Sequence, residues 1–213
     1  LSPEELFNQL PIPAQISLEK PYNIFITGVG GTGVTTVGSL IGMAAHIEGK
    51  ECSVVDMAGL AQKGGAVVSH LRISQHPDHI YATRVSHAGA DLILGFDLVV
   101  TAGTEGLGKI KPNHTKLLVN DYQSITGQFT KNPDYVFPQH AMKNDIVQKV
   151  SDDQLVDFIE ATQLVTDLMS DSIMTNLFIV GYALQKGLIP VSFNAMKEAI
   201  RLNGVAVEDN TTA

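Results

Sequence analysis

The fold of this 213-residue chain is decided by the stretch Asn23-Ile-Phe-Ile-Thr-Gly28-Val-Gly30-Gly31-Thr-Gly33-Val-Thr-Thr. An apolar strand runs into a glycine-rich turn, and the turn opens directly into a helix of small and apolar residues. Backbone N–H groups at the start of such a helix point towards whatever sits above the turn. The stretch therefore predicts a pocket for an anion or a nucleotide.

Outward from this turn, strand and helix patterns alternate along the chain. Strands are predicted at 22–27, 52–55, 66–73, 91–94 and 116–120, and helices at 31–49 and 97–110. A short strand at 80–83 is expected to pair with 66–73 across the turn at Pro77. The last third reads as helices at 141–150, 160–170, 171–186 and 192–203, with a last strand at 155–159. This rhythm predicts an α/β fold, an open Rossmann-like, mostly parallel sheet with flanking helices and a helical C-terminal part.

Length and composition indicate one folded domain, because 44% apolar residues supply a sizeable core. We expect residues 1–20, which are polar and punctuated by prolines, to be a linker or docking arm. Residues 21–213 are expected to form the α/β domain. We interpret the chain, which runs from Leu1 to Ala213, as a segment excised from a longer polypeptide.

Composition also disfavours several partners and locations. A net charge of −8 without clusters of Lys and Arg argues against nucleic acid. No apolar run approaches the ~20 residues that a membrane span requires, and the first 20 residues lack the pattern of a signal peptide. The single cysteine, Cys52, excludes an internal disulfide and favours the cytoplasm. One cysteine also cannot hold an iron–sulfur cluster, which needs about four thiolates.

The glycine turn matches the dinucleotide-binding fingerprint through Gly28, Gly30 and Gly33. A phosphate-loop NTPase is excluded, because Val34-Thr35 stands where that motif needs Lys-Ser/Thr. Asp56, which follows the second predicted strand, is in the right place for the acid that binds the ribose of NAD. A free-standing NAD-dependent dehydrogenase is therefore one hypothesis. The alternative is that the glycines only allow close packing and that Asp56 caps a loop.

A second glycine pair carries equal weight. Gln62-Lys63-Gly64-Gly65 follows the second strand and therefore leaves the same edge of the sheet as the first glycine loop. Two such loops on one edge form a rim with little side-chain cover. The sequence leaves two alternatives open, a tight turn before the next strand or a surface built to meet another chain.

Other residues admit both structural and functional explanations. His70 and Arg72 share one face of a predicted strand, and we expect them to face solvent or a partner rather than a substrate carboxylate. Asn176 lies in an apolar run, so its amide must find partners within the chain or in another subunit. Cys52 is expected to be a small core residue. The segment 76–79 contains two histidines but reads as a surface turn, not a metal site.

Several motifs in order resemble the gamma domain of 2-oxoacid:ferredoxin oxidoreductases, above all the fused indolepyruvate ferredoxin oxidoreductases of bacteria. The likeness runs from about residue 20 to 210. Its motifs are Gly28-x-Gly30-Gly31-x-Gly33, Asp56-Met-Ala-Gly-Leu-Ala-Gln62-Lys63-Gly64-Gly65, Ser69-His70-Leu-Arg72-Ile, Ala90-Asp91-Leu-Ile-Leu-Gly-Phe-Asp97 and Met174-Thr175-Asn176-Leu-Phe-Ile-Val-Gly181-Tyr.

The resemblance implies one part of a larger enzyme. Such enzymes oxidatively decarboxylate a 2-oxoacid on thiamine diphosphate, pass electrons through 4Fe-4S clusters to ferredoxin, and release an acyl-CoA. In that family the alpha and beta parts hold thiamine diphosphate and Mg, and a ferredoxin-like part holds the clusters. The gamma part packs beside the active site and helps accommodate coenzyme A. By this resemblance the chain alone holds no cofactor and is inactive.

The resemblance and the glycine motifs together define a candidate contact with coenzyme A and with the thiamine-binding parts. Coenzyme A carries phosphates, so it needs backbone donors and a cation, for which Lys63 is the natural choice. The oligomeric state is left open, with a homodimer among the alternatives, as is a docking module without any ligand. No catalytic residue or metal ligand is predicted, and the candidate contact residues are Gly28, Gly30, Gly31, Thr32, Gly33, Gln62, Lys63, Gly64, Gly65 and Asn176.

Overall fold

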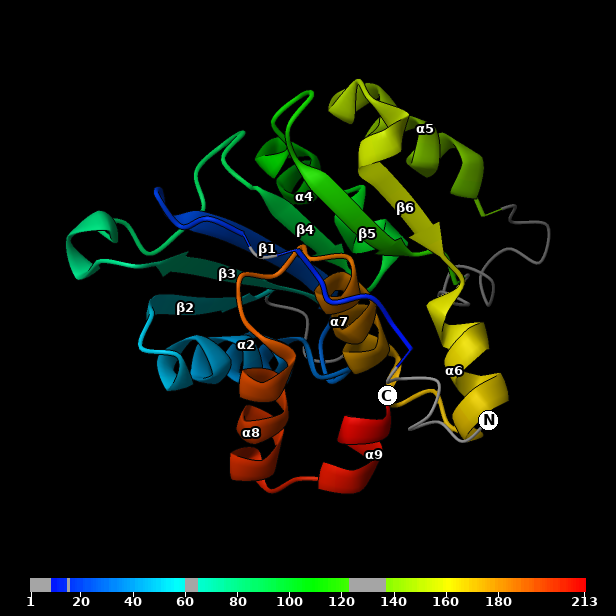
Figure 1. Ribbon diagram of the computed structural model, residues 1–213. Helices are drawn as coiled ribbons and strands as arrows, with labels where there is room; N and C mark the ends of the chain where they lie inside the picture. Colours follow the sequence, from blue (N-terminus) through cyan, green and yellow to red (C-terminus); the bar gives the residue numbers. More distant parts are fainter. Residues whose placement is uncertain (1–8, 15, 60–64, 123–136) are drawn as a thin grey trace.

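A computed structural model describes residues 9–14, 16–59, 65–122 and 137–213. Six strands form one sheet in the order β2-β3-β1-β4-β5-β6, with helices on both faces (Figure 1). The predicted fold class, an open, mostly parallel α/β sheet with flanking helices, is confirmed. The strands are β1 (Tyr22–Val29), β2 (Glu51–Ala58), β3 (Ala66–Ser74), β4 (Leu92–Gly95), β5 (Lys116–Asn120) and β6 (Val156–Ile159).

Two layers of helices cover the sheet. The helices are α2 (Val34–Ile47), α3 (Leu98–Thr101), α4 (Thr104–Lys109), α5 (Gln139–Val150), α6 (Ala161–Met169), α7 (Thr175–Gln185), α8 (Phe193–Asn203) and α9 (Val207–Thr212). On one face α2, α7 and α8 bury an apolar cluster that includes Ile24 and Ile26. On the other face α3, α4 and α5 bury a second cluster around Phe25 (Figure 1). Strand β1 thus supplies both cores, because alternate side chains of a strand point to opposite faces.

The antiparallel strand β3 separates the first two strands in the chain. It pairs with β1 in the register Phe25↔His70 and with β2 in the register Val55↔His70. The other five strands all run in one direction, since β1, β4, β5 and β6 pair in parallel and β2 is antiparallel to β3. The arrangement therefore differs from the usual dinucleotide-binding sheet, in which the second strand lies directly beside the first.

Helix α2 lies close to the sheet because glycines face the strands. A Cβ added at Gly38 would lie 2.7 Å from the Ser69 hydroxyl, and one at Gly42 would lie 2.8 Å from a methyl of Val54. Side chains at these positions would push the helix away from β2 and β3. The close packing also aligns the start of α2 with the end of β1.

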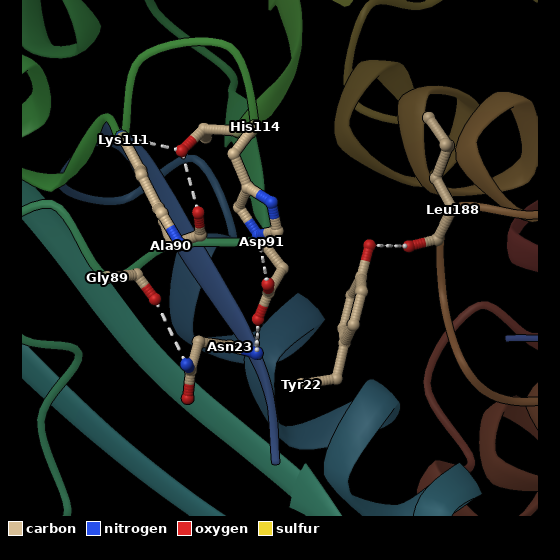
Figure 2. A network of polar contacts seen from close by, with 9 residues as sticks. Tyr22, Asn23, Gly89, Ala90, Asp91, Lys111, His114 and Leu188 are labelled. Carbon is tan, nitrogen blue, oxygen red and sulfur yellow. Dashed lines mark hydrogen bonds and ion pairs between the residues drawn. The ribbon is translucent and has the colours of Figure 1, made fainter. Parts of the chain in front are cut away.

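A polar network ties together the amino ends of the strands (Figure 2). The Asp91 carboxylate accepts a hydrogen bond from the Asn23 backbone N–H at 2.8 Å and contacts Nε2 of His114 at 2.7 Å. Nearby, the Tyr22 hydroxyl donates to the Leu188 carbonyl at 2.8 Å, and burial raises the pKa of this phenol. The network joins β1, the start of β4, the turn before β5 and the segment after α7. It lies at the amino ends of the strands, whereas the first glycine loop follows the carboxyl end of β1. We assign the network a structural role.

The predicted strand at 80–83 is wrong. A 3₁₀ turn (Pro77–His79) follows β3, and 80–83 contains no strand. The reason is that β1 and β2 already occupy both edges of β3, so no backbone groups of β3 remain for another partner. The segment is held instead by the Arg72 side chain, which donates to the Ala82 carbonyl at 2.7 Å.

Two helical predictions also need correction. The helix predicted at 97–110 is two short helices, α3 and α4, because the chain is extended at Gly103. Helix α9 lies in a segment for which no element was predicted. The remaining strands and helices occur where the pattern places them, with bounds shifted by a few residues. Among the described residues, 9–14 and 16–21 contain no helix or strand, and the division between arm and domain remains a prediction.

Every helix in the described ranges is too short or too polar to cross a lipid bilayer.

Candidate functional site

The first glycine loop lies where the sheet changes its direction of winding. From β1 the chain passes through α2 on one face to β2, whereas β4, on the other side of β1, leads to α3 on the opposite face. The chain segments that follow the carboxyl ends of β1 and β4 therefore diverge to opposite faces of the sheet. Open α/β sheets bind their ligands at such switch points.

The glycines of this loop have different roles. Gly28 is buried, and a Cβ there would lie 2.6 Å from a methyl of Val34, so this glycine allows the helix to pack on the strand. Gly31 and Gly33 have φ angles of 89° and 90°, a backbone conformation that residues with a side chain rarely adopt. Among the described residues, apart from the chain neighbours of each glycine, no atom lies within 4 Å of a Cβ built at either position. The described part of the chain therefore leaves the space beside Gly31 and Gly33 open.

The start of α2 lacks the usual capping groups. Its N-cap residue is Gly33, which has no side chain to accept a hydrogen bond from the first turn, and that turn contains no acidic residue. The N–H groups of Val34, Thr35 and Thr36 are therefore not capped by a side chain of the described part of the chain. A helix start in this state favours negative charge, as the sequence predicts.

The two glycine loops touch each other. The Gly30 N–H donates to the Gly65 carbonyl at 2.8 Å, and Val29 pairs with Ala66 at the end of the β1–β3 ladder. A Cβ at Gly30 would lie 3.4 Å from that same carbonyl oxygen. The predicted shared edge is thus confirmed for Gly30 and Gly65. Gln62, Lys63 and Gly64 lie outside the described residues, so their part in the site remains a prediction.

Asn176 connects a distant helix to the first loop. It lies in the first turn of α7, is 8% exposed, and donates its side-chain N–H to the Thr32 carbonyl at 2.7 Å. The Thr32 hydroxyl donates in turn to the Val29 carbonyl at 2.8 Å. The Asn176 amide therefore finds its hydrogen-bond partner within the chain, and it holds the first glycine loop in place.

A second buried amide, which the sequence pattern did not predict, lies at the same ends of the strands. Asn120 ends β5, is 6% exposed, and donates to the Phe96 carbonyl at 3.3 Å and to the Thr162 hydroxyl at 2.9 Å. It thereby links the segment after β4 to the start of α6. An amide at the end of a buried strand on the ligand-binding edge was the signal that could have identified it.

His70 was expected to face solvent or a partner, and this is wrong. The residue is fully buried under α4, and its Nδ1 accepts the Val85 backbone N–H at 3.1 Å. Burial and the nearby charges of Lys109 and Arg84 lower the pKa of His70 to about 4. Its neutral imidazole therefore belongs to the second core. Arg72 is half-buried and donates to the Asn23 side chain at 2.9 Å.

Asp56 does not meet the first glycine loop in the manner of an NAD site. It is exposed and pairs with Ser69, so β3 lies between its strand and β1. Two strand spacings amount to about 10 Å, whereas the ribose-binding acid of a dinucleotide site comes from the adjacent strand. The geometry therefore disfavours the dehydrogenase hypothesis.

No metal centre is evident among the residues that the structure describes. They contain no group of three or more His, Cys, Asp or Glu residues that could hold an ion. Cys52 is half-buried beside the first apolar cluster, and burial raises the pKa of its thiol to about 11. Its environment suits the small packing residue that the sequence predicts.

Comparison with known proteins identifies the family. The sequence profile of the pyruvate ferredoxin/flavodoxin oxidoreductase family matches residues 23–213. The chain belongs to this family. It is 30% identical over 187 residues to the indolepyruvate oxidoreductase subunit IorB of Pyrococcus horikoshii, covering 86% of this chain and 87% of the relative. The corresponding subunit of Thermococcus kodakarensis is 29% identical over the same shares of both chains.

Solved structures related to this pyruvate ferredoxin/flavodoxin oxidoreductase chain share its fold. The subunit PORC of pyruvate oxidoreductase from Thermotoga maritima superimposes with a TM-score of 0.62 at 15% identity, over 91% of this chain and 93% of its own. The 2-oxoglutarate:ferredoxin oxidoreductase of Magnetococcus marinus, with 2-oxoglutarate, coenzyme A and succinyl-CoA bound, gives 0.64 at 20% identity, over 90% of this chain and 29% of its own. The predicted resemblance is confirmed, and the chain is a component of a 2-oxoacid:ferredoxin oxidoreductase. The two curated relatives are archaeal subunits, so the expected origin in a fused bacterial polypeptide remains a prediction.

Proposed function

We propose that this chain is the gamma-type part of an oxidoreductase that oxidises indolepyruvate, or a related aryl 2-oxoacid, to an acyl-CoA. The substrate is suggested by the indolepyruvate oxidoreductase subunits that it resembles along most of its length. Thiamine diphosphate, Mg and the 4Fe-4S clusters are held by partner alpha, beta and ferredoxin-like parts in this proposal. Ferredoxin accepts the electrons of the whole enzyme, and the chain alone is inactive.

The rim of joined glycine loops serves, in this proposal, as the contact with coenzyme A and the thiamine-binding parts. The hydrogen bond between Gly30 and Gly65 is the observation that carries it, because it joins the first glycine loop to the residue that precedes β3. The uncapped start of α2 supplies N–H donors suited to a phosphate. Lys63, which lies three residues before the start of β3 at Ala66, supplies the cation.

A single substitution in the complete enzyme tests this assignment. Replacing Lys63→Ala should raise the KM for coenzyme A about tenfold, because a charge-assisted hydrogen bond contributes about 1.5 kcal/mol. The KM for the 2-oxoacid should stay the same, since that substrate binds in the partner parts. Lys116→Ala is the matched control, because Lys116 begins β5 and so lies at the amino ends of the strands, away from the glycine loops. An unchanged KM for coenzyme A in the Lys63 variant would remove the role of this lysine.

A further inference from the structure

Helix α6 carries an apolar strip that is exposed to solvent. Ala161 and Val165 are buried and attach the helix to the body of the domain, whereas Leu164 is 44% exposed and Leu168 is 74% exposed. Residues four apart lie on the same face of a helix, so these two leucines form one strip. Ile173, 69% exposed, follows in the turn that leads to α7. A second apolar face of this kind on a surface helix indicates an interaction site.

The margin of this strip is acidic. Between Lys149 and Lys186 the chain contains no Lys or Arg, but six acids. Glu160, Asp167 and Asp171 are exposed, and no described lysine or arginine forms an ion pair with them. Glu160 lies four residues before Leu164 and Asp167 lies three residues after it, so these two acids border the strip of leucines. The six acids are Asp152, Asp153, Asp157, Glu160, Asp167 and Asp171.

The strip lies near the carboxyl ends of the parallel strands, as the first glycine loop does. Helix α6 begins directly after the carboxyl end of β6 and projects beside α7 (Figure 1). Three residues after Ile173, Asn176 holds the first glycine loop through its bond to Thr32. The apolar strip and the glycine rim are therefore parts of one end of the molecule.

We propose that the strip of Leu164, Leu168 and Ile173 is a docking surface for a partner part of the same oxidoreductase. The partner surface that fits it has an aliphatic pocket bordered by Lys and Arg, which would complement the acidic margin. A second copy of this chain does not fit, because a two-fold contact would place the two acidic margins against each other. This inference rests on the proposed function, which requires a thiamine-binding partner at this end of the chain.

The substitution Leu168→Lys tests both the apolar and the electrostatic part of the proposal. It removes an apolar anchor and adds a positive charge that the basic margin of the partner repels. The affinity of the chain for the thiamine-binding part of its enzyme, measured by titration calorimetry, should fall about tenfold or more. Leu202→Lys, at the end of α8, is the matched control, because Leu202 is also a helical leucine and 54% exposed. This control should bind as the wild type does.

The outcomes separate the surface from the function. If the wild-type chain does not bind the thiamine-binding part at all, both the proposed function and this inference fail. If the wild type binds and Leu168→Lys binds equally well, only the docking surface is refuted. Self-association of the wild-type chain that weakens in Leu168→Lys would indicate a second copy as the occupant and would also refute it.

Hydrogen exchange gives an independent measurement. In the complete enzyme, the backbone amides of 161–173 should exchange more slowly than in the isolated chain, whereas those of 202–212 should not change. Equal exchange of 161–173 in both preparations would contradict the proposal. Both Leu168 and Leu202 are largely exposed, so neither variant should lose its fold, which circular dichroism verifies.

Discussion

At the scale of single residues, one amide decides the position of the first glycine loop. Asn176 is separated from Thr32 by 144 positions in the chain, yet its side chain donates to the Thr32 carbonyl at 2.7 Å. A loop of glycines has little side-chain packing to fix it, so such a bond limits the conformations that the loop adopts. The same bond explains why a polar residue occupies an apolar stretch of α7.

Replacing Asn176→Ala should therefore loosen the loop and lower the free energy of unfolding by about 1 kcal/mol, the net worth of one hydrogen bond. Urea denaturation of the isolated chain measures this change. Asn210→Ala is a suitable control, because its amide also donates to a carbonyl, that of Val205 at 2.8 Å, but in an exposed position. The prediction is wrong if both variants unfold at the same urea concentration as the wild type.

At the scale of elements, α4 and the segment before β4 bury a histidine of β3. His70 packs against the ring of Phe25 at 4.8 Å between centroids and accepts the Val85 N–H. The Glu105 carboxylate lies 3.8 Å from its Nε2 but is half exposed. Burial, Lys109 and Arg84 together lower the pKa of His70 to about 4, so the folded chain keeps this imidazole neutral.

Stability should consequently depend on pH between about 4 and 6.5. An unfolded histidine binds a proton below its usual pKa of about 6.5, whereas folded His70 does so only near 4. Within this window the unfolded state binds more protons, so this contribution to stability is lost as the pH falls. The free energy of unfolding should change by up to about 1.4 kcal/mol per pH unit on account of this group.

The substitution His70→Asn isolates this effect. Asparagine keeps an acceptor for the Val85 N–H but does not titrate, so the slope of stability against pH should decrease between pH 4 and 6.5. His76→Asn is the control, since His76 is exposed in the turn after β3. A slope unaltered in the His70 variant would show that another group causes the pH dependence.

At the scale of the whole molecule, strand order determines which side chains lie beside the first glycine loop. Since β3 separates β2 from β1, Asp56 lies about two strand spacings from the loop that matches the dinucleotide fingerprint. The fingerprint and its acid are thus both present in the sequence but are not brought together. In place of the acid, the loop of Gly65 lies beside the first glycine loop.

The isolated chain should consequently not be stabilised by NADH. A binder at about 100 times its dissociation constant gains about 2.7 kcal/mol, which would raise the midpoint of thermal unfolding by about 5–10 °C in a chain of this size. We expect no such shift in differential scanning fluorimetry with excess NADH. A dehydrogenase measured in parallel verifies the assay, and a clear shift for this chain would reinstate the NAD-binding alternative.

Local pattern determined much of this protein before any tertiary contact was considered. Apolar stretches such as Asn23–Thr27 and the spacing in 31–49 predict β1 and α2, because a strand or helix must bury a face with its own periodicity. The glycines at 28–33 mark the loop between them, since Gly31 and Gly33 have positive φ angles that other residues rarely adopt. The ordered motifs also identified the family.

Tertiary structure alone decided which of these segments meet. The pattern of β3 is compatible with any neighbour, and only the folded sheet inserts it between β1 and β2, which leaves no partner for 80–83 and separates Asp56 from the glycine loop. Burial of His70 and the bond from Asn176 to Thr32 likewise depend on contacts between residues far apart in the chain. Local periodicity records which face of an element is buried, but not which element buries it, because many neighbours satisfy the same apolar face equally well.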